Sequence, residues 1–202
     1  ANFKVDPRLT KLLGESYRST EQALKELVDN SWDADATAIS ITLPDPMTSN
    51  PIVIEDDGSG MTEQELRSEY LVVANDRRSR KGERTTRLKR LVKGRKGIGK
   101  FAGLMVADVM EIRTTTRGIT TRVVISKESL LNATRDLERI DLPLTVEPAS
   151  EGVLGTKVTL VGLNQRYEFP LPEKLKSLLM LEYGREEDIR IRVNSDFLGL
   201  DD

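Results

Sequence analysis

The pattern of apolar and polar residues predicts a first helix from about Thr20 to Trp32. Ser19 is followed three residues later by Gln22, the spacing of a capping box, in which side chains satisfy the first free N–H groups of a helix. Apolar residues then recur at the helical spacing of three and four positions. The stripe expected to face the core comprises Ala23, Leu24, Leu27 and Val28.

Strands are predicted where apolar and polar residues alternate, or where a short apolar run ends at turn residues. Residues 39–43 alternate and end at Pro44, and the apolar run 52–54 leads into a loop of Asp and Gly. Four further strands are predicted at 109–115, 120–126, 155–161 and 189–193. Because most of these strands follow one another as hairpins with helices between some of them, we expect an α+β two-layer α/β sandwich rather than a doubly wound fold.

Other helices are predicted from the same signals. Thr62 and Glu65 repeat the capping spacing and predict a second helix that ends near Ala74. A short helix should follow the second glycine-rich loop, another is predicted at 127–133, and a longer one at 171–183. Helices and strands therefore alternate irregularly along the chain, as expected for the α+β class.

Composition narrows the chemistry that the chain can use. Of the 202 residues 38% are apolar and none is cysteine or histidine, which excludes disulfides, thiolate sites, cysteine nucleophiles and Ser-His triads. The longest nearly apolar run, 101–110, is far shorter than the roughly 20 residues that span a bilayer, and the N-terminal residues lack the pattern of a secretion signal. We therefore expect a soluble, cytoplasmic protein with no membrane partner.

Charge is distributed unevenly. Twelve Lys and Arg lie between Arg77 and Lys100 with the single acid Glu83, whereas the rest of the chain carries 19 basic and 32 acidic residues. The stretch 75–96 has weak periodicity and predicts a long mobile loop. Either the charges keep this loop solvated, or they contact nucleic acid or an acidic partner, because phosphate neutralisation depends chiefly on Lys and Arg. The segment has no aromatic residue, which disfavours single-strand recognition by stacking.

Three polar residues share one face of the first helix beside the apolar stripe. Glu26, Asn30 and Asp33 stand at i, i+4 and i+7. A solvated helix face explains this pattern without any function. In the alternative, the amide oxygen of Asn30 binds Mg²⁺, which prefers oxygen ligands, and Glu26 orients and deprotonates a water molecule aimed at a γ-phosphate.

The loop 56–61, with the sequence Asp-Asp-Gly-Ser-Gly-Met, follows an apolar strand. Asp and Gly are ordinary turn residues, although two acids and two spaced glycines exceed what a hairpin needs. A carboxylate at a strand end can accept a hydrogen bond from the exocyclic amine of adenine, and glycines let a flat base approach the backbone. A turn and a purine contact are both open interpretations of this loop alone.

The second glycine loop, residues 94–100, admits three interpretations. A Walker A loop needs a hydroxyl after Lys100, where Phe101 stands. A dinucleotide fingerprint needs a buried strand before it, and 87–93 is too basic for one. We favour a glycine-rich turn whose N–H groups and following helix N-terminus hold phosphates, with Lys100 or Lys96 adding charge.

In this order and at these spacings, the motifs resemble those of the GHKL, or Bergerat-fold, ATPases. This family includes gyrase B subunits, heat-shock chaperone ATPases, histidine-kinase catalytic domains and MutL-type repair proteins. Residues 26–34 resemble its N-box, 56–60 its first glycine box, 94–99 its second, and 155–156 its late Gly-Thr element. The resemblance extends over residues 19–161 and is nearest to MORC-like, chaperone-like and MutL-like members.

The resemblance implies a mixed, largely antiparallel sheet with helices on one face, and ATP and Mg²⁺ as cofactors. It makes Glu26 the catalytic base, Asn30 the Mg²⁺ ligand and Asp56 the adenine acceptor, with Thr156 beside it. The other residues that it places at the nucleotide are Asp33, Gly58, Gly60, Met61, Gly94, Lys96, Gly97, Ile98, Gly99, Lys100 and Phe101.

The family pattern also implies an activity and an organisation. It predicts slow ATP hydrolysis by a domain at 1–170 with an ATP lid at about 76–96, then a closing helix and strand at 171–202 that lead to a downstream region absent from this chain. Lid closure commonly drives dimerisation in the family, so that ATP acts as a switch for attached domains. The alternatives are a non-catalytic ATP-sensing or nucleic-acid-binding module and, less favoured, a histidine-kinase domain, because a Glu four residues before the metal-binding Asn suits water as acceptor.

Overall fold

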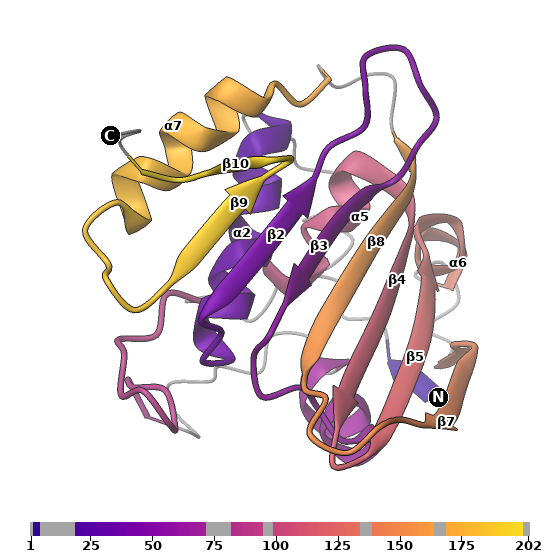
Figure 1. The fold of residues 1–202 in the computed structure, drawn as a ribbon. Coiled ribbons are helices and arrows are strands. Elements are labelled where there is room, and N and C mark those ends of the chain that lie inside the picture. The colour runs from indigo at the N-terminus through magenta and orange to yellow at the C-terminus, as the bar shows by residue number, and fades with distance from the viewer. Residues whose placement is uncertain are drawn as a thin grey trace.

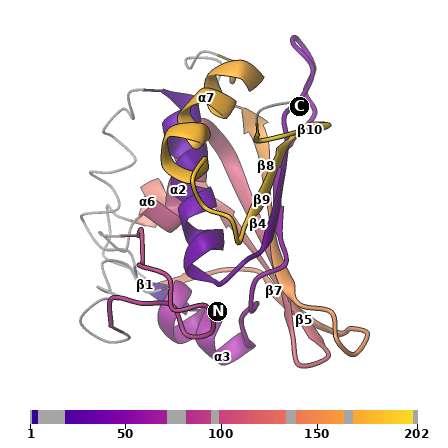
Figure 2. The same ribbon diagram turned by 60° about the vertical axis from the view of Figure 1, so that its left-hand side comes forward.

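The chain folds into one eight-stranded sheet with helices packed against one face, in a computed structural model that describes residues 2–4, 19–71, 82–94, 99–133, 139–163 and 169–199 (Figures 1 and 2). The predicted two-layer α+β sandwich is therefore confirmed. In order across the sheet, the strands are β10 (Asp196–Phe197), β9 (Arg190–Val193), β2 (Ala38–Thr42), β3 (Ile52–Asp56), β8 (Gly155–Leu163), β4 (Ala107–Thr116), β5 (Ile119–Ser126) and β7 (Leu144–Pro148).

Strand pairing is antiparallel throughout the sheet except between β2 and β9, which run parallel. The register sets Thr156 of β8 opposite Asp56 of β3 on one side and Thr114 of β4 on the other. Three adjacent strands thus bring these residues to one end of the sheet. A separate two-stranded ribbon pairs β1 (Asn2–Lys4) with β6 (Arg139–Asp141).

The helical layer is built around the long helix α2 (Thr20–Asp33), and the C-terminal helix α7 (Pro172–Tyr183) packs against it (Figure 2). Among the described residues, no helix is long and apolar enough to cross a membrane. The α-helices are α2 (Thr20–Asp33), α3 (Glu63–Glu65), α5 (Gly103–Val106), α6 (Lys127–Ala133) and α7 (Pro172–Tyr183), with a π-helical turn at Leu66–Tyr70 and a 3₁₀ turn at Gly99–Phe101.

Helix α2 forms as its sequence predicts. Ser19 Oγ accepts a hydrogen bond from the N–H of Gln22 at 3.2 Å, which caps the first turn. The whole apolar stripe is buried against inward-facing side chains of the sheet, including Ile41 and Ile54. Burial of one such aliphatic side chain contributes about 1.5–3 kcal/mol, more than the few tenths that separate most helix propensities. Packing therefore fixes α2 in place.

The second predicted helix differs from its expectation. Its capping box is confirmed, because Thr62 Oγ1 accepts from the N–H of Glu65 while the Glu65 carboxylate accepts from the N–H of Thr62. The α-helical turn is nevertheless short and passes into the π-helical turn, whose last residue is Tyr70. The predicted end near Ala74 lies outside the described residues.

Residues 82–94, here named the anchored segment, are irregular as predicted, but they pack on the body of the protein. A single bridge pairs Arg84 with Leu91. Thr85, Arg90 and Val92 are each less than 10% exposed. These three residues are therefore not solvated as predicted, whereas the mobility of the stretch stays a prediction. The remainder, including residues 77–81 and 95–96, lies outside the described residues.

Candidate functional site

The end of β3 places the side chain of Asp56 where three parts of the chain meet. Its Oδ1 accepts the N–H groups of Gly58 at 2.9 Å and of Thr156 at 3.2 Å. Its Oδ2 accepts the hydroxyl of Ser31, from α2, at 2.6 Å. A helix, a loop and the neighbouring strand β8 thus hold one carboxylate in a fixed orientation.

The Asp56 carboxylate can accept one more hydrogen bond. A carboxylate offers about four lone-pair positions, and donors from the described part of the chain occupy three of them. Burial raises the pKa of Asp56, and hydrogen bonds from Ser31, Gly58 and Thr156 offset part of that rise. The remaining position on Oδ2 suits a neutral N–H donor, such as the exocyclic amine of a purine.

Asp57, the next residue, is bound differently. It accepts the backbone N–H groups of Thr37 at 2.7 Å and Ala38 at 2.8 Å, and also the Thr37 hydroxyl at 2.6 Å. Burial alone would raise the pKa of Asp57, but these hydrogen bonds outweigh it and lower the pKa. Of the two acids in the loop, Asp57 fastens the loop to β2, while Asp56 retains an acceptor position that no donor from the described residues occupies.

Two glycines around Asp56 adopt backbone conformations that other residues rarely take. Gly60 has φ +62° and Gly155 has φ +133°. A Cβ at Gly60 would overlap the carbonyl oxygen of Thr115, and one at Gly155 would overlap that of Asp56. Both glycines therefore allow close contact between the loop and the ends of β4 and β8.

Thr114, in β4, belongs to this site although sequence reasoning did not single it out. Its hydroxyl accepts the N–H of Met61 at 2.8 Å and lies 3.0 Å from the Thr156 hydroxyl. The register of β4 against β8 creates this contact, and no local motif signals it. Ser31, by contrast, stands within the N-box motif, so its contact with Asp56 could have been suspected.

Glu26 and Asn30 lie one turn apart on α2. The Glu26 carboxylate lies against Gly99, at the start of the 3₁₀ turn, so closely that a Cβ there would overlap it. The Asn30 amide nitrogen is buried and finds no hydrogen-bond partner among the described residues. The structure thus brings together the predicted base and a residue of the predicted phosphate loop.

The orphaned amide of Asn30 tests whether the site suits Mg²⁺. A half-turn of the amide exchanges its nitrogen and oxygen, so an acceptor oxygen can take the unpartnered position. A buried polar atom without a partner costs about 1–3 kcal/mol. Coordination of a cation that prefers oxygen ligands would remove this cost, so the residue present fits Mg²⁺.

Asp33 contacts the beginning of the second glycine loop. One carboxylate oxygen accepts the N–H of Lys93 at 2.9 Å, and the other accepts that of Gly94 at 3.0 Å. The side chain is buried. Asp33 and Gly94, both predicted site residues, are therefore in contact, and direct contact of Asp33 with a nucleotide stays a prediction.

Lys100 and Phe101 follow the loop into the helical layer. Lys100 Nζ donates to the carbonyl oxygen of Glu69 at 3.0 Å and lies 5.5 Å from the ring centres of Tyr70 and Phe101. The Phe101 side chain is fully buried in the core. The predicted residues that fall outside the described part of the chain are Lys96, Gly97 and Ile98.

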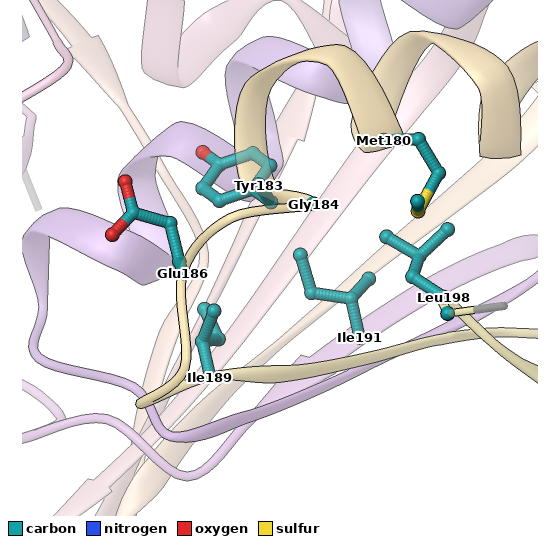
Figure 3. Close-up of a pocket in the computed structure, with 8 residues that line it drawn as sticks. Met180, Tyr183, Gly184, Glu186, Ile189, Ile191 and Leu198 are labelled. Atoms are coloured by element: carbon teal, nitrogen blue, oxygen red, sulfur yellow. The ribbon is translucent and has the colours of Figure 1, made fainter.

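A separate pocket lies between α7 and the strands β9 and β10 (Figure 3). Its lining includes the apolar side chains of Met180, Ile191 and Leu198 and the ring of Tyr183. No predicted site residue lines it. This pocket is therefore distinct from the site around Asp56 and α2.

Comparison with known proteins agrees with this geometry. A family model described as "Histidine kinase-, DNA gyrase B-, and HSP90-like ATPase" matches residues 17–152, more than half of the chain. The chain belongs to this ATPase family. The resemblance to GHKL ATPases is thereby confirmed at the level of the family, and the mixed, largely antiparallel sheet is consistent with the Bergerat fold. Membership implies ATP binding, which in GHKL ATPases typically involves Mg²⁺.

The chain is also similar to a curated protein, the putative type II restriction enzyme HgiDII of Herpetosiphon aurantiacus. The two are 34% identical over 102 residues, which is 50% of this chain and 16% of that protein. The similarity therefore concerns a small part of a much longer protein.

Proposed function

We propose that this GHKL ATPase domain binds ATP with Mg²⁺ and hydrolyses it. The observation that carries the proposal is the Asp56 carboxylate, held by three donors and left with one acceptor position, at one end of a site whose other end is Glu26 against Gly99. The first arrangement suits a purine amine, and the second suits hydrolysis beside a phosphate loop.

At the base end, Asp56 would accept the adenine amine, and the hydroxyls of Thr114 and Thr156 would line the same end. Met61, half-buried and bound through its N–H to Thr114, would pack on the base. Gly58 donates its N–H to Asp56 and thereby holds the acceptor in place. These contacts support preference for adenine over a purine without an amine at that position.

At the phosphate end, Asn30 would hold Mg²⁺ together with phosphate oxygens. The cation would neutralise charge that develops on the phosphates. Glu26, one helical turn before Asn30, would accept a proton from the attacking water. The backbone N–H groups of the second glycine loop, with Lys100, would bind the phosphate oxygens. Because Glu26 precedes Asn30 by four residues, water is the acceptor that this pattern favours.

We also propose that residues 76–96 close over the bound nucleotide as a lid, and that closure promotes a nucleotide-dependent homodimer that acts as a switch for attached domains. Family membership supports this part of the proposal. Sedimentation of the domain with a non-hydrolysable ATP analogue tests it. A nucleotide-dependent shift to the dimer is expected, and a monomer at all nucleotide concentrations would contradict it.

The decisive test of ATP binding compares two adjacent aspartates. Calorimetric titration should show that Asp56→Asn weakens Mg-ATP binding at least about 100-fold, because the substituted amide places a donor toward the adenine amine. Asp57→Asn is the matched control, since Asp57 binds Thr37 and Ala38 instead. Equal loss in both variants, or no binding by the wild type, would contradict the proposal.

Hydrolysis is tested separately at Glu26. Glu26→Gln should lower turnover by about 100-fold or more while the Kd for Mg-ATP changes little, because a general base acts on the attacking water. Phosphate release measures turnover, and calorimetry measures binding in the same preparations. Unchanged turnover in the variant would assign the base elsewhere.

A nucleic-acid-coupled ATPase is a second candidate, favoured by the basic stretch 77–100 and by the similarity to a putative restriction enzyme. DNA affinity that falls steeply between low and moderate salt would support it. Absence of binding at low salt would exclude it. In the anchored segment, several of the basic side chains already donate to protein acceptors.

A further inference from the structure

Arg90 is the most thoroughly bound residue of the anchored segment. Its side chain is only 4% exposed. The guanidinium donates to the Asp188 carboxylate at 2.7 Å, to the Asp188 carbonyl at 2.7 Å and to the Ala36 carbonyl at 2.6 Å. Its carbon centre also lies 4.2 Å from the centre of the Trp32 ring. The three hydrogen bonds and the stacking on Trp32 together fix the orientation of the Arg90 guanidinium.

The residues that follow Arg90 connect it to the second glycine loop. The Trp32 ring nitrogen donates to the carbonyl of Leu91 at 2.9 Å. Two and three positions later, the N–H groups of Lys93 and Gly94 bind the Asp33 carboxylate. The entry to the phosphate loop is therefore held from Arg90 onward against the C-terminal end of α2.

The same residues reach the C-terminal helix and strand. Lys93 Nζ donates to the Glu182 carbonyl at 3.0 Å and lies 4.1 Å from the centre of the Tyr183 ring. Tyr183, in turn, donates its hydroxyl to Asp29 of α2 at 2.5 Å. Asp188 lies in the connection between α7 and β9. The turn between α7 and β9 thus forms one wall of the Arg90 site.

We propose that Arg90 is a positioning residue for phosphate binding, through which the α7–β9 turn sets the placement of Lys93 and Gly94 at the entry of the second glycine loop. The inference rests on the proposed function. Its physical basis is the planar guanidinium, which binds three acceptors in fixed directions while it stacks on an indole, a combination that an ammonium group does not reproduce. Among the described residues, the hydrogen bonds to Asp56 come from Ser31, Gly58 and Thr156, none of which belongs to the anchored segment.

The test is Arg90→Lys, with binding measured by calorimetry for both Mg-ATP and adenosine. Because the described contacts of Arg90 lead to Lys93 and Gly94 and not to Asp56 or Thr156, we expect ATP binding to weaken roughly tenfold, the lower end of what supporting residues contribute around metal sites. Adenosine binding should stay unchanged. Asp188→Asn, which keeps the backbone acceptor and the shape of the turn, should give a smaller loss in the same direction. Arg122→Lys is the matched control, because Arg122 pairs with Glu111 on the exposed face of the sheet.

Amide hydrogen exchange provides a readout that does not depend on any nucleotide. In Arg90→Lys the N–H groups of Lys93 and Gly94 should exchange faster, while that of Gly58 should not. Equal weakening of ATP and adenosine, or unchanged ATP binding, would overturn the inference, as would unchanged exchange at Lys93 and Gly94. If the wild type binds neither ligand, the proposed function fails, and exchange still decides whether Arg90 holds this stretch.

Discussion

The first glycine loop and the anchored segment are both irregular and rich in charge, yet their charges are used in opposite ways. In the first loop, Asp56 accepts hydrogen bonds from Ser31 of α2, Thr156 of β8 and Gly58 of the loop itself, and the described residues leave one of its acceptor positions open. In the anchored segment, the cations belong to the loop and the acceptors to the framework, as with Arg87 on the carbonyl of Asp35 and Arg90 on Asp188. A charged loop therefore indicates a ligand site only where its side chains keep hydrogen-bonding positions that the protein itself does not occupy.

The largest loss of stability is expected from a substitution at Gly155, which lies against Asp56. Gly155→Ala should destabilise the protein by about 3 kcal/mol or more, because a strained backbone and a steric overlap add together. The overlap is with the carbonyl oxygen of Asp56, so the purine end should lose its shape. Chemical denaturation measures the free energy of unfolding.

Gly152→Ala is the control for that experiment. Gly152 also has a positive φ, +81°, but a Cβ there meets nothing within 4 Å. Its cost should stay near 1 kcal/mol, the difference between Gly and Ala in a left-handed conformation. Equal costs at the two glycines would show that contact with Asp56 does not constrain Gly155.

The next largest loss of stability is expected at Asp35, whose carboxylate binds the anchored segment to the body of the protein. Its carboxylate accepts the N–H groups of Arg87 at 2.7 Å and Leu88 at 3.1 Å, and its own φ is +61°. Asp35→Ala should cost about 2–3 kcal/mol, since it removes the acceptor of the Arg87 and Leu88 N–H groups and of the Thr85 side chain and places Ala in a left-handed conformation. Asp35→Asn should cost less, because Asn tolerates that conformation and keeps an acceptor. Similar losses in both variants would contradict this reasoning.

A smaller effect is expected at Trp32, the only tryptophan in the sequence. Trp32→Phe keeps an aromatic face for Arg90 but removes the donor to the Leu91 carbonyl. We expect a loss of about 1 kcal/mol, the usual net value of one such hydrogen bond. Thermal unfolding followed by circular dichroism measures it. A loss above about 3 kcal/mol would mean that the shape of the indole matters more than its N–H group.

The pH dependence of stability should distinguish the two regions, because the pKa of Asp35 is lowered whereas the pKa of Asp56 is raised. Burial would raise the pKa of Asp35, but hydrogen bonds from Thr85, Arg87 and Leu88 lower it below 3.8. Its contribution to stability is thus present above pH 3.8 and is lost as the pH falls through the folded-state pKa. The stability advantage of the wild type over Asp35→Asn should shrink in that range.

Asp56 should behave in the opposite way. Burial raises its pKa above 3.8, so its contribution to stability is present below pH 3.8 and is lost as the pH rises through the folded-state pKa. Wild type and Asp56→Asn should therefore diverge on the neutral side, with the wild type losing stability relative to the variant. The same pH trend in Asp35→Asn and Asp56→Asn would contradict the difference between the regions.

Much of the fold follows from local patterns in the sequence. Helix α2, with its cap at Ser19 and its apolar stripe, was predicted almost to its ends, as were β4, β5, β8 and α7. The strands that were missed, β7 and β10, are exposed edge strands, and β1 and β6 have three residues each. Short edge strands bury one face or neither, so their sequences carry little alternation.

The candidate site was predictable where its contacts lie within one motif. Glu26 and Asn30 share a helix face, and Gly58 is two residues from the carboxylate that it supports. Thr114 could not be found in this way, because the register between β4 and β8 brings it to Thr156. The role of Arg90 could not be predicted for a related reason: its acceptors at Ala36 and Asp188 are 54 and 98 residues away in the chain.

The position of β8 has a practical consequence for cutting and recombining this module. The matched family region ends at residue 152, three residues before β8 begins, yet β8 lies in the interior of the sheet between β3 and β4. A fragment trimmed at that boundary would leave β3 and β4 without β8 and β2 without β9, and such unpaired strand edges invite aggregation. Recombinant chimaeras should therefore keep the chain at least through β9, whose parallel pairing with β2 protects the far side of the same sheet.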